Sequence, residues 1–229
     1  MDSKSTRVLA LISVLLSCAS VPEYVNSKPA QLGTLHIWVQ PDPVITANLV
    51  LDGCRFWEPV GVKCEIVQNP AKADVVVSVS YEPCLSLARK RVAATKTGAM
   101  AGVTALRPEC KAVFPKDEDI TEAWSMLGLS TMAGQVTLYP MCMSWAGGGI
   151  VVPDMVRRTA AHEVGHELGI NHVPLSCNDN CVQYELDAAG AKLCGPAIMN
   201  APIVDAMHIT PIDADAFRRP NTRLFPNRQ

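Results

Sequence analysis

The sequence predicts an α+β fold. Its first half holds short segments in which β-branched and other apolar residues alternate with polar ones, a pattern typical of half-buried strands. Its second half holds two segments with helix-start signals, at Asp154 and at Thr210. Strands that precede helices, instead of alternating regularly with them, are typical of the α+β class. The chain has 229 residues, 48% of them apolar, which is enough for one domain with a sizeable core.

The strands are predicted from this alternation and from the turn residues that bound it. The clearest strand places Val75, Val77 and Val79 on one face, and Pro140 ends the last strand. A helix between the first two strands is expected to end near Gly53. The predicted strands cover residues 34–40, 62–68, 73–81 and 134–140, and this helix covers residues 46–57.

The two later helices are predicted from their first residues. Asp154 is expected to be the N-cap of a helix that runs to about Leu168. In the last helix, residues 209–219, Thr210 is the expected N-cap and Pro211 takes the first helical position, where the missing N–H costs no hydrogen bond.

The N-terminus has the organisation of a secretory signal. Lys4 and Arg7 precede an apolar run, residues 8–16, which small residues follow. The run is too short to span a bilayer, which takes about 20 residues. We therefore expect an exported protein with a signal peptide over residues 1–19, a tether over residues 20–33 and a folded domain over residues 34–229.

Two cleavage sites compete within this signal. The residues before Cys18 resemble a bacterial lipobox, although Leu16 is larger than usual at its position, and cleavage there would leave a lipidated Cys18 that tethers the domain to a membrane surface. Ordinary cleavage would follow Ala19. Nine cysteines minus Cys18 leave eight, an even number that could pair fully outside the cytosol, whether extracellular, periplasmic or at the cell surface. No particular pairing is preferred.

The charge excludes one class of partner. A formal net charge of −2 gives no electrostatic argument for nucleic-acid binding, and the short basic run at residues 89–91 is expected to be solvated surface. Membrane contact is expected only through a lipid on Cys18, and the protein is expected to be a monomer.

The stretch AHEVGHELGINH carries three of the five histidines and predicts a metal site. His162 and His166 are four residues apart, so on a helix both imidazoles project from one face and can reach one Zn²⁺. Gly169 can end the helix in the left-handed conformation and turn the chain so that His172 becomes a third ligand. Three protein ligands leave a coordination position open, as in catalytic zinc sites, and Glu163 is placed to hydrogen-bond a water there.

The same stretch matches the H-E-x-x-H-x-x-G-x-x-H signature of the metzincin zinc endopeptidases. GPAIMNAP resembles the methionine-bearing turn of that family, with Met199 as the residue that underlies the zinc. The chain is most similar to the matrixin, or matrix metalloproteinase-like, branch. The resemblance implies a two-lobed catalytic domain with a twisted mixed β-sheet, an active-site helix, a Met-turn and a C-terminal helix around one catalytic Zn²⁺.

The resemblance also implies an activity. The protein would be a secreted or surface-anchored endopeptidase that hydrolyses peptide bonds through a zinc-bound water activated by Glu163. A protein or peptide substrate would lie extended along residues 135–139, interpreted as the strand at the sheet edge. Residues 201–203 would help to form the wall of the main specificity pocket.

Several residues depart from the matrixin pattern. Val173 follows the last histidine where small polar residues are common, and Asn200 replaces a frequent tyrosine. Only His36 and His208 remain outside the motif, too few for a second, histidine-rich zinc site. No tyrosine ligand of the astacin type follows Met199, and the sequence has no room for an inhibitory pro-segment.

A long segment separates His172 from Met199. It contains Cys177, Cys181 and Cys194, which are expected to staple a loop at the rim of the cleft instead of binding a second metal. The acidic groups at residues 117–119 and 178–180 could hold calcium, but neither has EF-hand spacing, and solvated loops are the preferred interpretation.

Two other functions remain open. An exported protein could hold zinc and bind a partner without proteolysis, although the presence of Glu163 argues against a purely structural zinc. A zinc hydrolase could instead act on a non-peptide amide, which only substrate profiling distinguishes.

Overall fold

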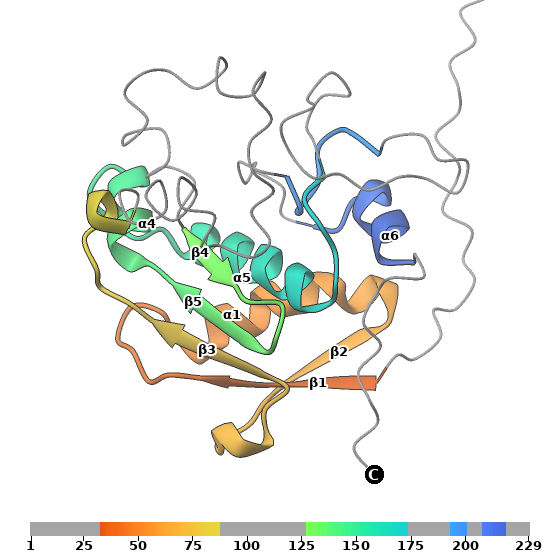
Figure 1. Ribbon diagram of the computed structural model, residues 1–229, viewed down its shortest axis with the longest axis horizontal. Coiled ribbons are helices and arrows are strands. Elements are labelled where there is room, and N and C mark those ends of the chain that lie inside the picture. Colours follow the sequence, from red (N-terminus) through yellow and green to blue (C-terminus); the bar gives the residue numbers. More distant parts are fainter. Residues whose placement is uncertain (1–32, 88–126, 174–192, 201–207, 219–229) are drawn as a thin grey trace, which may run out of the picture.

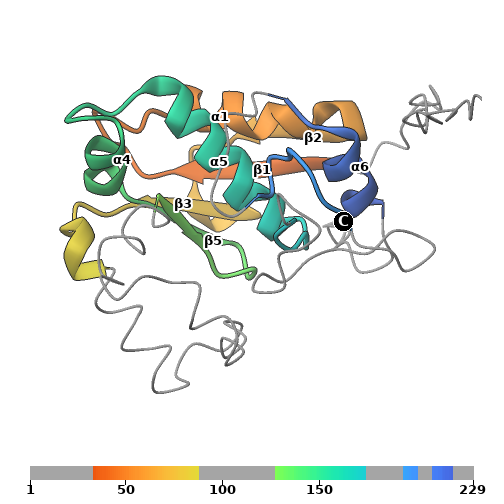
Figure 2. The same ribbon diagram turned by 90° about the horizontal axis from the view of Figure 1, so that it is seen from above.

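The computed structural model describes residues 33–87, 127–173, 193–200 and 208–218. Among these residues the strands form one mixed five-stranded sheet with the order β2-β1-β3-β5-β4, which confirms the α+β class. Helices α1 and α5 lie side by side over the sheet (Figure 1), and α5 runs above the strands when the molecule is seen from above (Figure 2). The strands are β1 (Gly33–Val39), β2 (Val62–Ile66), β3 (Val75–Val79), β4 (Gly128–Ser130) and β5 (Gln135–Leu138).

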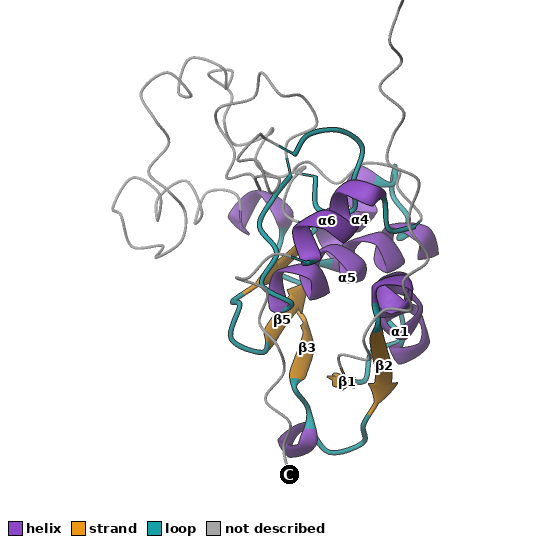
Figure 3. Cartoon of the chain, turned by 90° about the vertical axis from the view of Figure 1, so that its right-hand side faces the viewer, coloured by secondary structure: helices purple, strands orange, loops and turns teal. Residues whose placement is uncertain are grey.

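The α-helices α1, α4, α5 and α6 lie on one side of the strands (Figure 3). Thr46 caps α1 by accepting a hydrogen bond from the Leu49 N–H, and α1 continues into a 3₁₀ turn, η1. The last helix begins as predicted, with Thr210 as N-cap and Pro211 in the first turn. The described helices are α1 (Ala47–Cys54), η1 (Arg55–Val60), η2 (Pro70–Lys72), α4 (Pro140–Ala146), α5 (Pro153–Glu167) and α6 (Pro211–Phe217).

The start of α5 differs from the prediction. Val152 is the N-cap and Pro153 opens the helix, so Asp154 lies in the first turn instead of capping it. There the Asp154 carboxylate accepts a hydrogen bond from Arg157, one turn later. Proline explains the shift, because it is well suited to the first helical position and cannot donate a hydrogen bond further inside.

All four predicted strands are present, but the predicted edge of the sheet is wrong. β5 pairs with β3 in parallel and with β4 in antiparallel orientation, so it is an inner strand. The edge strand on this side is β4, whose three residues were not predicted because Gly-Leu-Ser shows no alternation. β1 pairs in parallel with both β2 and β3, and α1 and η1 form the crossover between β1 and β2.

The core lies between the sheet and the helices. Leu35 and Ile37 of β1 are fully buried, and Val77 of the neighbouring β3 is nearly so, because alternate residues of each strand face the same side. Trp57 of η1 is also fully buried, and its indole N–H donates a hydrogen bond of 2.9 Å to the carbonyl oxygen of Ala161 in α5. This contact fixes α5 against the residues that follow α1.

Two disulfides join separate elements of the described fold. Cys54–Cys64 links α1 to β2, and Cys84–Cys142 links the residues after β3 to α4. Cys194 is disulfide-bonded as well. Such bonds are compatible with an exported protein. The described part of the chain has no helix long and apolar enough to span a bilayer. The predicted signal peptide, Cys18 and all of the tether except Gly33 lie outside the described residues.

Candidate metal centre

Helix α5 carries the first two histidines into the core. Its second half is buried on all sides, from Thr159 to Glu167. Small residues make this possible, because Ala160, Ala161 and Gly165 allow neighbouring elements to approach closely. A Cβ atom added at Gly53 of α1 would overlap the carbonyl oxygen of Arg157, so the two helices pack almost backbone to backbone.

The helix ends in a turn that brings back the third histidine. Gly169 has a φ of +88°, the left-handed conformation that glycine adopts without strain. The Gly169 N–H donates to the His166 carbonyl at 2.9 Å and the Ile170 N–H donates to the Gly165 carbonyl at 3.0 Å, which is a Schellman motif. His172 follows this turn and contacts the other two imidazoles.

The three imidazoles converge on one point. Nε2 of His172 lies 3.1 Å from Nε2 of His162 and 3.0 Å from Nε2 of His166. Two ligands of a tetrahedral zinc with bonds of 2.0–2.1 Å are about 3.3 Å apart, so these spacings suit one ion. His162, His166 and His172 form the group of described residues that could hold a metal ion.

In each helix histidine, the hydrogen bond made by one ring nitrogen determines which nitrogen can bind a metal. Nδ1 of His162 lies 2.8 Å from the carbonyl oxygen of Ile198, and Nδ1 of His166 lies 2.8 Å from that of Ile170. A carbonyl only accepts, so in both rings Nδ1 carries the proton and Nε2 keeps its lone pair. A cation can accept both lone pairs together with that of His172, whereas one N–H on His172 can point to only one of them. The donor set therefore fits a metal ion.

The environment keeps the helix histidines neutral. Burial lowers the pKa of His162 well below its ordinary value of 6.5, and repulsion from His166 and His172 lowers it further. Burial also lowers the pKa of His166. The neutral imidazole is the form that binds metal, so both side chains are prepared for a ligand role.

Met199 packs against α5 at Gly165. It is fully buried, and a Cβ atom added at Gly165 would overlap its sulfur and come within 2.7 Å of Trp57. Gly165 stands between His162 and His166 in the sequence, so the methionine packs against the helix at the level of the site. The preceding residue, Ile198, supplies the carbonyl that orients His162.

Two polar side chains that were not singled out as site residues hold the Met199 turn in place. Asp213 of α6 is fully buried and accepts hydrogen bonds from the N–H groups of Ile198 and Met199, at 3.0 and 3.1 Å. Asn200 is also fully buried and donates to the carbonyl of Val173 at 2.7 Å. An aspartate three residues after an N-cap threonine predicts a capping box, but nothing local in the sequence connects it to a turn that begins at Gly195.

Glu163 lies beside the histidines on α5 and faces the edge strand. Its side chain is buried, with a relative exposure of 5%. A Cβ atom added at Gly128 of β4 would lie 2.7 Å from the Glu163 Oε1 atom. The carboxylate therefore occupies the space that the missing side chain of Gly128 leaves.

Other residues of the sequence predictions are not placed. Cys177, Cys181, residues 201–203 and both acidic groups considered for calcium, 117–119 and 178–180, lie outside the described residues. No protein-family model matches the chain, and a search of curated proteins finds no significant match. The inference of function therefore depends on the residues and their geometry.

Proposed function

We propose that the protein is a zinc-dependent endopeptidase of the metzincin type, similar to the matrixins. The convergence of three histidine Nε2 atoms beside a buried glutamate carries this proposal. The mixed sheet, the helix that ends at a left-handed glycine and the methionine that packs against Gly165 of that helix support the proposal.

His162, His166 and His172 would hold the ion in this enzyme. A bound zinc would act there as a Lewis acid, which would polarise a carbonyl oxygen and lower the pKa of a water to about 7. The backbone carbonyls of Ile198 and Ile170 orient the rings of the helix histidines, so that their Nε2 atoms would be available to the ion.

Glu163 would be the general base. Its carboxylate takes one proton from the attacking water, the water oxygen bonds to the carbonyl carbon, and the proton passes to the amide nitrogen as the C–N bond breaks. Its position supports this role, because it lies beside a ligand histidine in a largely dry environment. Gly128 leaves it the room it needs.

The substrate would bind along β4. One edge of β4 pairs with β5, and no strand of the described chain pairs with its other edge. An extended peptide can add itself to such an edge through backbone hydrogen bonds. We therefore propose Gly128–Ser130 as the substrate-binding strand, in place of residues 135–139, which were expected from the sequence. Export of this enzyme through its N-terminal signal is part of the same proposal and agrees with the disulfides.

The proposal is tested with a library of unstructured peptides, incubated with and without a zinc chelator. We expect cleavage that the chelator abolishes and zinc restores. Glu163→Ala should keep one zinc per chain and lose activity by about 10²–10⁴-fold, because it removes the general base and leaves the ligands. Full turnover by this variant would refute the assigned mechanism.

The same assay separates the alternatives. Zinc at one ion per chain without cleavage of any peptide would favour a non-proteolytic binding protein. Cleavage of small amides but not of peptides would favour a hydrolase for non-peptide substrates.

A further inference from the structure

A second buried carboxylate lies one helical turn beyond Glu163. Glu167 has a relative exposure of 5% and ends α5. Its Oε1 atom accepts a hydrogen bond of 2.6 Å from the Ser130 hydroxyl, and its Oε2 atom accepts one of 2.6 Å from the Gly134 N–H. It is not a member of the described group that could hold a metal ion, which consists of His162, His166 and His172.

These partners lie at the two ends of the turn between β4 and β5. Ser130 is the last residue of β4, and Gly134 directly precedes β5. Ser130 also accepts a hydrogen bond from the N–H of Met132, the only described residue other than glycine with a positive φ. One carboxylate of α5 thus holds both sides of a turn that contains a strained residue.

The distance between the two glutamates along α5 is similar to the distance between their two partner residues along β4. One turn of helix separates Glu163 from Glu167 by about 6 Å, and two residues of strand separate Gly128 from Ser130 by about 7 Å. Glu163 contacts Gly128 and Glu167 binds Ser130, so helix and strand run in the same direction in register. The helix that presents the base therefore also determines where the edge strand lies.

We propose that Glu167 is a positioning residue for peptide binding: it holds β4 at the distance and register from Glu163 at which a peptide paired with β4 presents its scissile bond to the base. The inference rests on the proposed function, because it takes β4 as the substrate strand. Glu167 would act through Ser130 and Gly134 and touch neither the water nor the substrate.

Glu167→Ala tests the inference by the kinetics of two substrates. A long peptide that spans β4 should lose on the order of ten-fold or more in kcat/KM, mainly through a higher KM, because two charge-assisted hydrogen bonds are lost. A short substrate that ends beside the scissile bond should change little, and zinc content should stay at one per chain. Glu167→Gln, which keeps one carbonyl acceptor, should give an intermediate loss. Equal losses for both substrates, or a loss in kcat alone, would overturn the inference.

Hydrogen exchange supplies a readout that needs no activity. In Glu167→Ala the Gly134 amide and the amides of β4 and β5 should exchange faster than in the wild type, whereas α1 and β1 should be unchanged. Unchanged exchange in β4 and β5 would show that Glu167 does not hold these strands, and would refute the inference even if the protein is a peptidase. Faster exchange in a protein that cleaves no peptide would show that Glu167 holds β4 but refute its role in positioning a peptide substrate.

Asp154→Ala is the matched control, because it removes another carboxylate from the same helix. Asp154 lies at the exposed start of α5 and pairs with Arg157. We expect this variant to have wild-type KM for both substrates and wild-type exchange in β4. A Glu167→Ala that behaves like this control would contradict the inference.

Discussion

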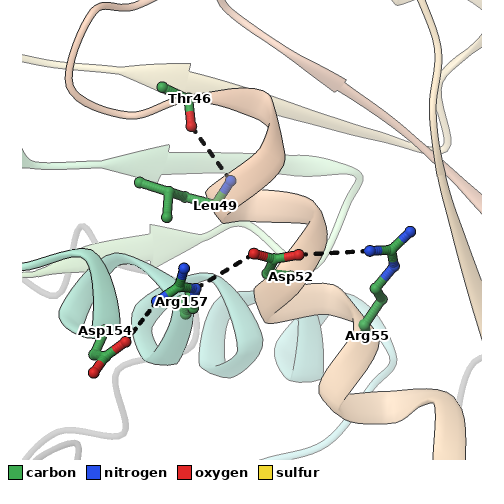
Figure 4. A network of polar contacts seen from close by, with 6 residues as sticks. All are labelled: Thr46, Leu49, Asp52, Arg55, Asp154 and Arg157. Atoms are coloured by element: carbon green, nitrogen blue, oxygen red, sulfur yellow. Dashed lines mark hydrogen bonds and ion pairs between the residues drawn. The ribbon is translucent and has the colours of Figure 1, made fainter.

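The two ends of α5 carry polar clusters of different kinds: exposed ion pairs at its start and largely buried histidines at its end. At its start, Arg157 forms ion pairs with Asp154 of the same helix and Asp52 of α1, and Asp52 also pairs with Arg55 (Figure 4). Each of these side chains keeps 30–55% of its surface exposed. At its end, the buried imidazoles of His162 and His166 converge with the half-buried imidazole of His172, which follows the helix.

The difference shows how burial decides what a polar cluster can do. The two charges of an exposed ion pair give up contacts with water to contact each other, so the pair adds little to the free energy of unfolding, typically up to about 1 kcal/mol. Buried imidazoles cannot be charged cheaply, so they stay neutral and keep lone pairs for a cation. We therefore expect changes at the histidine end to affect metal binding and stability strongly, and changes at the exposed end to affect stability only slightly.

The largest effect is expected from His172→Ala. It removes one ligand outright, and loss of an outer-shell partner alone already costs about 10–100-fold in metal affinity, so the loss should exceed about 100-fold. Zinc content after dialysis against a competing chelator measures it. His208→Ala is the control, because His208 is exposed and outside the group, and it should bind zinc normally. An unchanged zinc content in His172→Ala would refute the three-histidine site.

The next effect is expected from Gly165→Ala. The added methyl would overlap the Met199 sulfur and crowd Trp57, both fully buried, so the free energy of unfolding should fall by about 3 kcal/mol. Urea unfolding of the metal-free protein measures the change without a contribution from ligand binding. Wild-type stability in this variant would show that Met199 does not pack against the helix at this position.

Asp213→Asn should have a smaller effect. One of the two carboxylate oxygens that accept backbone hydrogen bonds from the Met199 turn is replaced by an NH2 group, which cannot accept, at a cost of about 2 kcal/mol in unfolding free energy. Because Ile198 in that turn orients His162, zinc affinity should fall by about 10-fold as well. A loss of stability with unchanged zinc affinity would separate the turn from the metal site.

Arg157→Ala should have the smallest effect. It breaks both ion pairs at the exposed end of α5 and should lower the unfolding free energy by less than about 1 kcal/mol, with the difference from wild type shrinking at high salt. Zinc affinity should not change. A loss as large as that of Gly165→Ala would contradict the contrast between the two ends.

Local patterns in the sequence account for much of the sheet and both later helices. Alternation places strands at β1, β2, β3 and β5, and the Thr210–Pro211 pair marks the start of α6. β4 was not predicted, because a three-residue strand of Gly-Leu-Ser carries no periodic signal. Without β4, β5 was wrongly taken as the edge strand of the sheet. Pairing between strands is a non-local property that no single segment encodes.

The candidate site divides in the same way. His162, Glu163 and His166 follow from helical spacing and Gly169 from its conformational freedom, so a single local motif predicts them. Gly128, Glu167 and Asp213 were missed, because each is defined by a partner more than ten residues away. A Gly, a Glu and an Asp in these positions look unremarkable until the fold supplies those partners.

By itself the sequence determined most of the elements and the three histidines that could hold a metal ion, because periodicity, capping and motif spacing act over a few residues. Only the tertiary structure decided that β4 forms the edge of the sheet, that Met199 lies against Gly165, and that Glu167 joins α5 to the turn before β5. These are contacts between segments far apart in the chain. They form where buried polar groups find partners and small residues leave room, and both conditions exist only once the core has assembled.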